Sequence, residues 1–215
     1  MKNKSCNILK VKSATDSYNN SEFWKDIPAI VIDNYLWMKN SYKPKVEAKV
    51  CYNDQNMFVH FKSYEVEITA KYTEINDPVH KDSCVEFFVN LFPCKTNKYF
   101  NFEVNPIGTM HAGFGAVGTR SKLSIEDIRK IHIYCSIAKP ITGEYRNDFW
   151  EIYYKIPISL FEKYYELNFN TENAIGNFYK CGDETKYKHY GVWNNIISEK
   201  PNFHQPKYFG DLIFV

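Results

Sequence analysis

The sequence predicts a single all-β domain, and three observations lead to this prediction. Leu is scarce, whereas Ile, Val, Tyr and Phe, which favour strands, are plentiful, and aromatic residues make up 17% of the chain. Short apolar–polar alternations recur along the chain with turn residues between them, which is typical of a sandwich or a barrel. At 215 residues the chain is long enough to bury one sizeable core.

The expected elements follow in chain order. Residues 1–26 are polar and rich in Ser, Asn and Lys, so we expect an N-terminal extension packed on a β-domain that spans residues 27–215. Asn53 and Asp54 suit the turn between the first two strands. The strand-like runs are residues 45–52, 57–68, 83–91, 99–105, 109–114, 131–138, 150–156, 174–181 and 208–214.

Two short helices are predicted from capping-box patterns. Ser124 precedes Asp127 by three residues, a variant of the pattern, and Ser159 precedes Glu162 in the usual form. We expect a helix to begin at each serine, the second running to about residue 167. Both helices are expected at the ends of sheets, away from any chemistry.

The composition excludes several classes of function. The formal net charge is +2, from 27 basic and 25 acidic residues with no basic cluster, so we expect no nucleic-acid partner. No apolar run has the length of a membrane span, so no membrane is expected either. The six cysteines lack a Cys-x-x-Cys spacing, which predicts mostly buried free thiols rather than a zinc ribbon. Residues 1–4 begin like a signal peptide but no apolar segment follows, so the sequence is compatible with a cytoplasmic protein and with a secreted one whose leader has been removed.

The most informative stretch is a predicted hairpin with one apolar and one polar face. In residues 83–91 and 99–105 apolar residues such as Phe87 and Phe102 alternate with polar ones, among them Glu86, Asn101 and Glu103. If residues 92–97 form the connecting loop, Glu86 lies opposite Glu103. Opposed like charges are destabilising, so this pair requires a partner: a shared proton, a cation, a basic side chain or the hydroxyl groups of a ligand.

Three interpretations of this polar face are compatible with the pattern. A sugar-binding face would use Glu86, Asn101 and Glu103 to bond hydroxyl groups. A glycosidase would use Glu86 and Glu103 as its two carboxylates, because a separation of about 5–5.5 Å suits retaining chemistry. A solvated sheet face, with both carboxylates paired to Lys or Arg, would have a structural role or bind a protein partner.

The same stretch resembles family 9 carbohydrate-binding modules. The residues that carry the resemblance are 82–88, 99–103 and the Asn105-x-x-Gly108 turn. Further similarities follow in the expected order: residues 177–181, the His189-Tyr190-x-x-Trp193 cluster and residues 203–210. From about residue 25 to the C-terminus the chain is similar to the stand-alone, family 9-like branch of the DOMON-like β-sandwiches.

The resemblance implies a fold and a mode of binding. The fold is a two-sheet antiparallel β-sandwich, of jelly-roll or DOMON-like form, with one or two short helices. Such modules bind a mono- or oligosaccharide between two aromatic rings and do not cleave it. Trp193 matches one ring, with Tyr190 as a further platform, and His80 stands at the position of the other ring.

The resemblance also implies the polar part of the site. Glu86 matches the acidic ligand of the family and Arg120 its basic one, and Asn101 and Glu103 would complete the shell around the sugar hydroxyls. Calcium is a common structural ion of the family; no other cofactor is expected, and the sequence assigns neither metal ligands nor a protein partner. A glycosidase and a structural or protein-binding sandwich stay as the alternatives.

Overall fold

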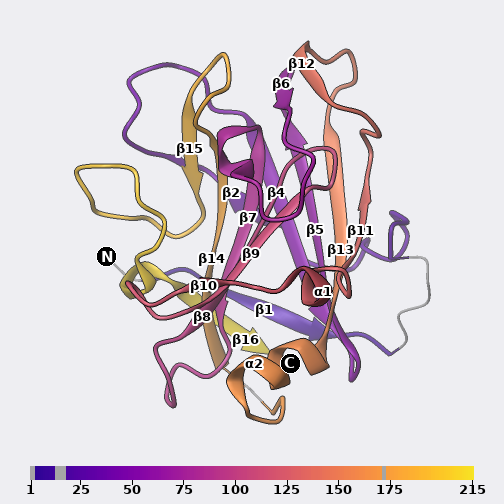
Figure 1. Ribbon diagram of the computed structural model, residues 1–215, viewed down its shortest axis with the longest axis vertical. Coiled ribbons are helices and arrows are strands. Elements are labelled where there is room, and N and C mark those ends of the chain that lie inside the picture. Colours follow the sequence, from indigo (N-terminus) through magenta and orange to yellow (C-terminus); the bar gives the residue numbers. More distant parts are fainter. Residues whose placement is uncertain (1–2, 13–17, 171–172) are drawn as a thin grey trace.

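The computed structural model describes residues 3–12, 18–170 and 173–215. It confirms the all-β fold class: strands fill the molecule as two packed sheets, and the short helices α1 and α2 lie in the lower half of the view in Figure 1.

The first sheet carries the polar hairpin. Its strand order is β10–β9–β8–β7–β14–β16–β1, and β15, followed by β3, extends from β14. The bounds of these strands are β1 (Ser5–Lys10), β3 (Asn34–Tyr35), β7 (Cys84–Asn90), β8 (Tyr99–Val104), β9 (Met110–Gly115), β10 (Ser121–Lys122), β14 (Asn173–Gly182), β15 (His189–Val192) and β16 (Gly210–Phe214).

The second sheet continues from the other half of β1. Its strand order is β1–β4–β5–β13–β11, and β2 pairs with the first half of β4. A separate pair, β6 with β12, extends beyond β5 and β13. The bounds are β2 (Ile30–Ile32), β4 (Lys45–Tyr52), β5 (Asn56–Tyr64), β6 (Glu67–Ala70), β11 (His132–Cys135), β12 (Ile141–Glu144) and β13 (Trp150–Pro157).

Strand β1 lies in the segment that we expected to form an extension. Its first residues pair with β16 in the first sheet and its last two, Leu9 and Lys10, pair with β4 in the second, so the strand joins the two sheets. Both pairings are parallel, in contrast to the antiparallel pairs described for the other strands. Within β1 Ile8 is fully buried, and backbone hydrogen bonds rather than an apolar face place the strand. Further along the segment, Trp24 packs against the second sheet beside Phe58.

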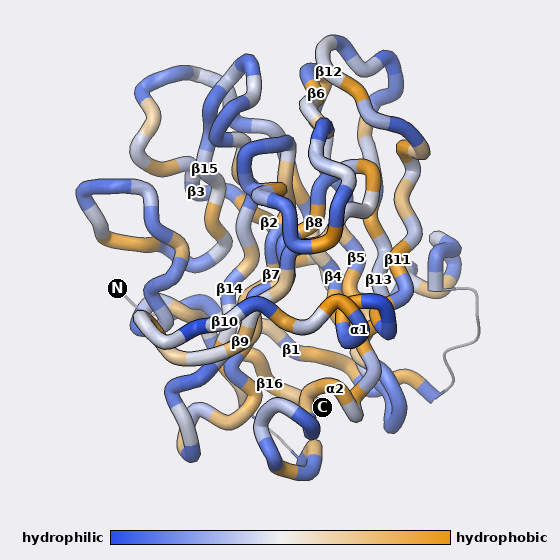
Figure 2. The backbone as a smooth tube through the Cα atoms, in the orientation of Figure 1, coloured by the Kyte–Doolittle hydropathy of each residue, from blue (hydrophilic) through white to orange (hydrophobic). Residues whose placement is uncertain are grey.

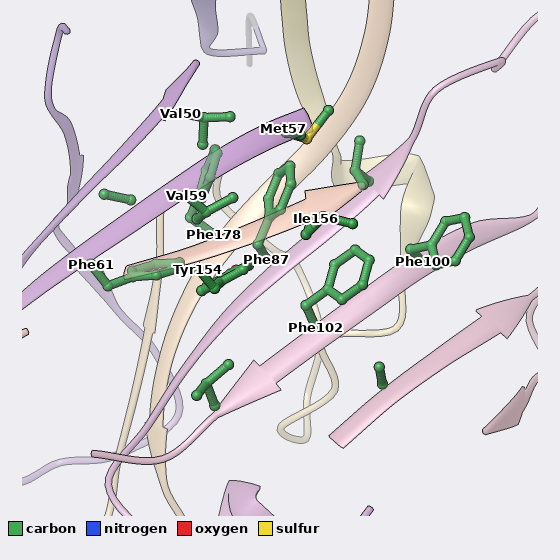
Figure 3. Packing of buried hydrophobic residues seen from close by; sticks show 14 of the residues in the cluster. Val50, Met57, Val59, Phe61, Phe87, Phe100, Phe102, Tyr154, Ile156 and Phe178 are labelled. Atoms are coloured by element: carbon green, nitrogen blue, oxygen red, sulfur yellow. The ribbon is translucent and has the colours of Figure 1, made fainter. Parts of the chain in front are cut away.

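The core lies between the two sheets, as the alternation predicted. From the first sheet Phe87, Phe102 and Phe178 point inward, and from the second Val59 and Tyr154 point toward them (Figure 3). The rings of Phe87 and Phe178 stack with their centroids 4.9 Å apart. Figure 2 shows the same division along the chain, with hydrophobic residues concentrated in the strands and hydrophilic residues in the outer loops.

The predicted register of the polar hairpin is confirmed. Glu86 on β7 pairs with Glu103 on β8, and Phe88 pairs with Asn101. The short strands β2, β3, β10, β12 and β15 were not predicted, because runs of two to four residues carry little periodicity. The expected strand 57–68 is divided into β5 and β6 by the buried, polar Glu65.

The helices differ in how they begin. Helix α1 (Ile125–Ile128) is capped as predicted, since the Ser124 side chain accepts a hydrogen bond from the Asp127 backbone N–H. Helix α2 (Ile158–Tyr165) begins after Pro157, so Ser159 lies inside it and is not its cap. Its Glu162 carboxylate accepts from the Phe169 backbone N–H instead of closing a capping box. Neither helix, nor any other in the described part of the chain, has the length and hydropathy to cross a membrane.

Candidate functional site

A pocket lies over the polar face of the β7–β8 hairpin. Its volume is about 300 Å³. Glu86, Glu103 and Cys181 come from three adjacent strands and form its floor. The walls come from the one-turn helix η1 (Val79–Lys81), the turn between β14 and β15, strand β15 and the segment that follows β15. The wall residues are His80, Asp183, Tyr190, Pro201, Asn202, Phe203 and His204.

The polar face is buried, so it is not the solvated sheet surface of our third interpretation. Only 2% of Glu86 and 1% of Asn101 are exposed to solvent. Helix η1 contacts β7, β8 and β14, and the one-turn helix η2 (Pro206–Tyr208) contacts β14. Burying carboxylates and amides is costly unless they are bonded, so this face contains paired groups or groups that await a ligand.

The two carboxylates of the floor differ in their surroundings. Glu103 accepts a hydrogen bond from the Asn101 side-chain amide at 2.7 Å, and Nδ1 of His80 lies 4.0 Å from its other oxygen. Glu86 has the Cys181 thiol as its hydrogen-bond donor, at 3.0 Å. Burial, and then the neighbouring Cys181 and Glu103, raise the pKa of Glu86 well above its usual range. The apposition of the two carboxylates is thus relieved by favouring the protonated form of Glu86.

Arg120 lies beside the pocket rather than across the two carboxylates. Its guanidinium stands 4.4 Å from the centroid of the Tyr99 ring, and one of its nitrogens donates to Nδ1 of His204 at 3.0 Å. The Tyr99 hydroxyl also lies 3.0 Å from this nitrogen. Burial and the charge of Arg120 lower the pKa of His204 to about 3. His204 is therefore neutral, and because its Nδ1 accepts, the ring proton resides on Nε2.

The structure does not place Trp193 where we expected it. Its ring packs edge-on against Phe178 in the main core, and 5% of the residue is exposed. Gly210 leaves room for the ring, because a Cβ there would lie 2.5 Å from Cζ3 of Trp193. A ring buried in this way offers no face to a sugar, so the expected platform is corrected.

Other aromatic rings form the apolar wall. Phe203 stacks on Tyr179 at 4.2 Å between centroids, and Tyr190 meets the ring of Trp37 edge to face at 5.8 Å. Trp37 also packs against Phe203. Tyr190 lines the pocket, as expected, and His80 lines it as a polar, half-exposed side chain.

The pocket thus brings together four of the predicted residues and places two more beside them. Glu86, Glu103, His80 and Tyr190 line it. Asn101 and Arg120 contact residues that line it. The wall residues Asp183, Pro201 and Asn202 were not predicted, because they lie in loops about a hundred residues from the hairpin. Phe203 and His204 stand in a run that carried the resemblance, and that run was the available signal.

Several residues of the resembling motif are structural. The Asp82 carboxylate accepts from the backbone N–H groups of Lys71 and Tyr72 at 2.9 and 3.1 Å, and from the Asn105 amide at 3.0 Å. The Asn105 side-chain oxygen accepts from the Thr109 backbone N–H. Gly108 has a φ of +83°, which completes this turn. These residues hold β8, β9 and the loop before η1 in the positions that form the pocket.

The residues that could hold a metal ion do not suit calcium. Within the described part of the chain, one group of three or more His, Cys, Asp or Glu ligand atoms is close enough, and it consists of Cys84, Glu86 and Cys181. Calcium takes six to eight oxygen ligands, and thiols are not among them. The structural calcium implied by the resemblance therefore has no ligand set at this position.

Comparisons with known proteins define the family. The chain belongs to carbohydrate-binding family 9, whose sequence model matches residues 20–214. No curated protein matched the chain.

The fold is shared with several solved structures. A putative carbohydrate-binding protein from Bacteroides uniformis ATCC 8492 is 29% identical, with a TM-score of 0.87 over 99% of this chain and 100% of that one. A family 9 module from Caldicellulosiruptor kristjanssonii in complex with glucose is 12% identical, with a TM-score of 0.65 over 99% and 96% of the two chains. The same kind of module in complex with cellotriose gives a TM-score of 0.63 at 12% identity, over 98% and 93%. At 12% identity the similarity concerns the fold.

Proposed function

We propose that this protein binds a saccharide, without cleaving it, in the pocket floored by Glu86 and Glu103. The observation that carries the proposal is the combination in one pocket of buried carboxylates and aromatic rings. A sugar presents hydroxyl groups around its edge and apolar C–H groups on its faces. Carboxylates and amides match the hydroxyls, and rings such as Phe203 match the faces.

The polar groups of the pocket are suited to hydroxyl groups in both directions. Glu103, Asp183 and Asn202 supply acceptor oxygens. His204 supplies a donor, because its Nδ1 already accepts from Arg120. By analogy with the relatives that hold glucose and cellotriose, neutral sugars are the first ligands to test.

The arrangement supports binding over cleavage. The two carboxylates of a glycosidase flank the scissile bond, so both have to be reachable from the pocket. Glu86 is bonded to Cys181 and almost fully buried, so it is poorly placed to reach a glycosidic oxygen. Glu103 is held by Asn101.

Titration of the purified protein by calorimetry against a panel of mono- and oligosaccharides tests this proposal. We expect a dissociation constant in the micromolar to millimolar range, or about −4 to −8 kcal/mol. Trp37 contacts two wall residues, so its fluorescence provides a second readout. The absence of binding at millimolar ligand across a broad panel would contradict the proposal.

Two variants locate the site and one distinguishes catalysis. Phe203→Ala removes a wall ring and is expected to weaken binding about 3- to 10-fold. Tyr134→Ala removes an exposed ring from β11 in the second sheet and is the matched control, with unchanged affinity expected. Turnover of aryl glycosides that Glu86→Gln abolishes would favour a glycosidase instead.

A further inference from the structure

Two thiols and a carboxylate converge beneath the pocket. Cys84 on β7 and Cys181 on β14 are direct partners in the antiparallel register, so their side chains project from the same face of the sheet. Glu86 follows two residues after Cys84 on the same strand and the same face. One ligand atom from each of these three residues lies within 4.8 Å of the other two.

We propose that Cys84, Glu86 and Cys181 form a binding site for a thiophilic divalent cation, Zn²⁺. Two sulfur ligands and one carboxylate oxygen are a donor set that zinc takes and that calcium and magnesium do not. The proposal does not depend on sugar binding, since the ligands and the ion are sufficient to test it.

The geometry approaches that of a zinc site. Zinc–sulfur bonds of about 2.3 Å in a tetrahedron place two sulfurs about 3.8 Å apart, so the two sulfurs, which lie within 4.8 Å of each other, have to close by about 1 Å or less. Cys181 and the Glu86 carboxylate already lie 3.0 Å apart. Glu86 and Cys181 line the pocket, which provides a path of entry and leaves a fourth position for water.

A cation would also satisfy a group that the protein leaves without a basic partner. Within the described ranges, no Lys, Arg or His forms a salt bridge with Glu86. Its neighbour on the adjacent strand is a second carboxylate, Glu103, which adds negative charge. Zinc would bind as both thiols and the Glu86 carboxyl lose their protons to solvent, which gives a complex with one net negative charge. Arg120 lies close enough to Glu86 to interact with its charge and would offset part of that negative charge.

Cobalt(II) titration of the reduced, full-length protein tests the site directly. Bound to thiolates in tetrahedral geometry, Co²⁺ produces charge-transfer absorption in the near ultraviolet and visible d–d bands. We expect one Co²⁺ per chain, displaced by Zn²⁺. A folded, fully reduced protein that shows no thiolate band with Co²⁺ overturns the proposal.

Single substitutions assign the ligands. Cys84→Ser and Cys181→Ser are each expected to weaken Co²⁺ binding by about 10-fold or more, and Glu86→Gln to weaken it while thiolate absorption persists. Cys94→Ser removes an exposed thiol in the β7–β8 loop and is the matched control, with no change expected. A thiolate band that survives in both Cys84→Ser and Cys181→Ser, or that disappears in Cys94→Ser, overturns the assignment.

A measurement on the unmodified chain decides the question if the serine variants do not fold. Zn²⁺ is expected to slow the alkylation of both Cys84 and Cys181, mapped by peptide mass, while exposed Cys94 stays reactive. Equal rates with and without Zn²⁺ at both buried thiols would count against the site. Because this readout needs no sugar, its failure is distinct from a failure of saccharide binding.

Discussion

Lys180 and Glu65 form an ion pair inside the sandwich, and removing one partner is the sharpest test of how this fold is stabilised. The Lys180 ammonium lies 3.1 Å from the Glu65 carboxylate, and both side chains are fully buried. Ser83 and Trp150 donate to the same carboxylate at 3.0 and 3.2 Å. Lys180 precedes Cys181 in the pocket floor, and its ammonium donates to the Cys181 carbonyl.

Lys180→Met leaves the Glu65 carboxylate buried without its cation. Breaking a buried pair in this way costs about 3–5 kcal/mol, which for a domain of this size lowers Tm by roughly 6–20 °C. Adding Glu65→Gln to Lys180→Met is expected to recover much of the loss, because the uncharged amide accepts from Trp150 through its oxygen and donates through its NH2 group to the Ser83 hydroxyl. Urea unfolding followed by tryptophan fluorescence measures both variants, with Trp150 as a local reporter.

The matched control is an ion pair of shorter distance at the surface. Lys186 lies 2.6 Å from Glu67, and its side chain is 58% exposed. If distance decided stability, Lys186→Met would be the more damaging change; if burial decides it, Lys186→Met has little effect, because water screens the pair. A Lys180→Met variant no less stable than Lys186→Met would refute this reasoning.

Three further outcomes are expected. Burial lowers the pKa of His189 to about 2, so below pH 6.5 the unfolded chain takes up a proton that the folded chain does not bind. Acidification from pH 7 to 5 therefore lowers the unfolding free energy by about 2 kcal/mol through His189, and urea unfolding at both pH values is expected to show a smaller loss in His189→Gln. Gly113→Ala places a Cβ 2.7 Å from the Asn101 side-chain oxygen and 2.9 Å from Arg120. We expect the variant to lose about 1–3 kcal/mol of unfolding free energy, measured in urea, and to bind saccharide more weakly, measured by calorimetry. Wild-type values in both measurements would contradict the close contact. Ser124→Ala removes the cap of α1 and is expected to cost about 1 kcal/mol in urea unfolding, whereas an unchanged midpoint would show that the cap is dispensable.

The buried polar face is preorganised for the saccharide binding that we propose. Asn101, Glu103, Arg120 and His204 are held mainly by one another, so their positions are set before a ligand arrives. Such preorganisation reduces the entropy lost on binding, which matters for a weak ligand such as a sugar.

The sequence by itself determined the strands and the register of the hairpin. Side-chain direction alternates strictly along a strand, so one apolar face imposed the parity that sets Glu86 opposite Glu103. The Ser124 cap was also readable, because its interactions are local. These features depend on residues close together in the chain.

Only the tertiary structure decided what covers the hairpin. The walls come from η1, the β14–β15 turn, β15 and the segment that follows β15, and neither Asp183 nor Asn202 has a local pattern that reveals where its loop packs. The resemblance made Trp193 a platform for the sugar, but Gly210, on a strand that follows in the chain, leaves room for its ring in the core. Strand β1 joins the two sheets through backbone hydrogen bonds, which leave almost no trace in side-chain composition. Local alternation therefore determines which face a residue occupies, whereas long-range packing determines whether that face is open, covered or part of a site.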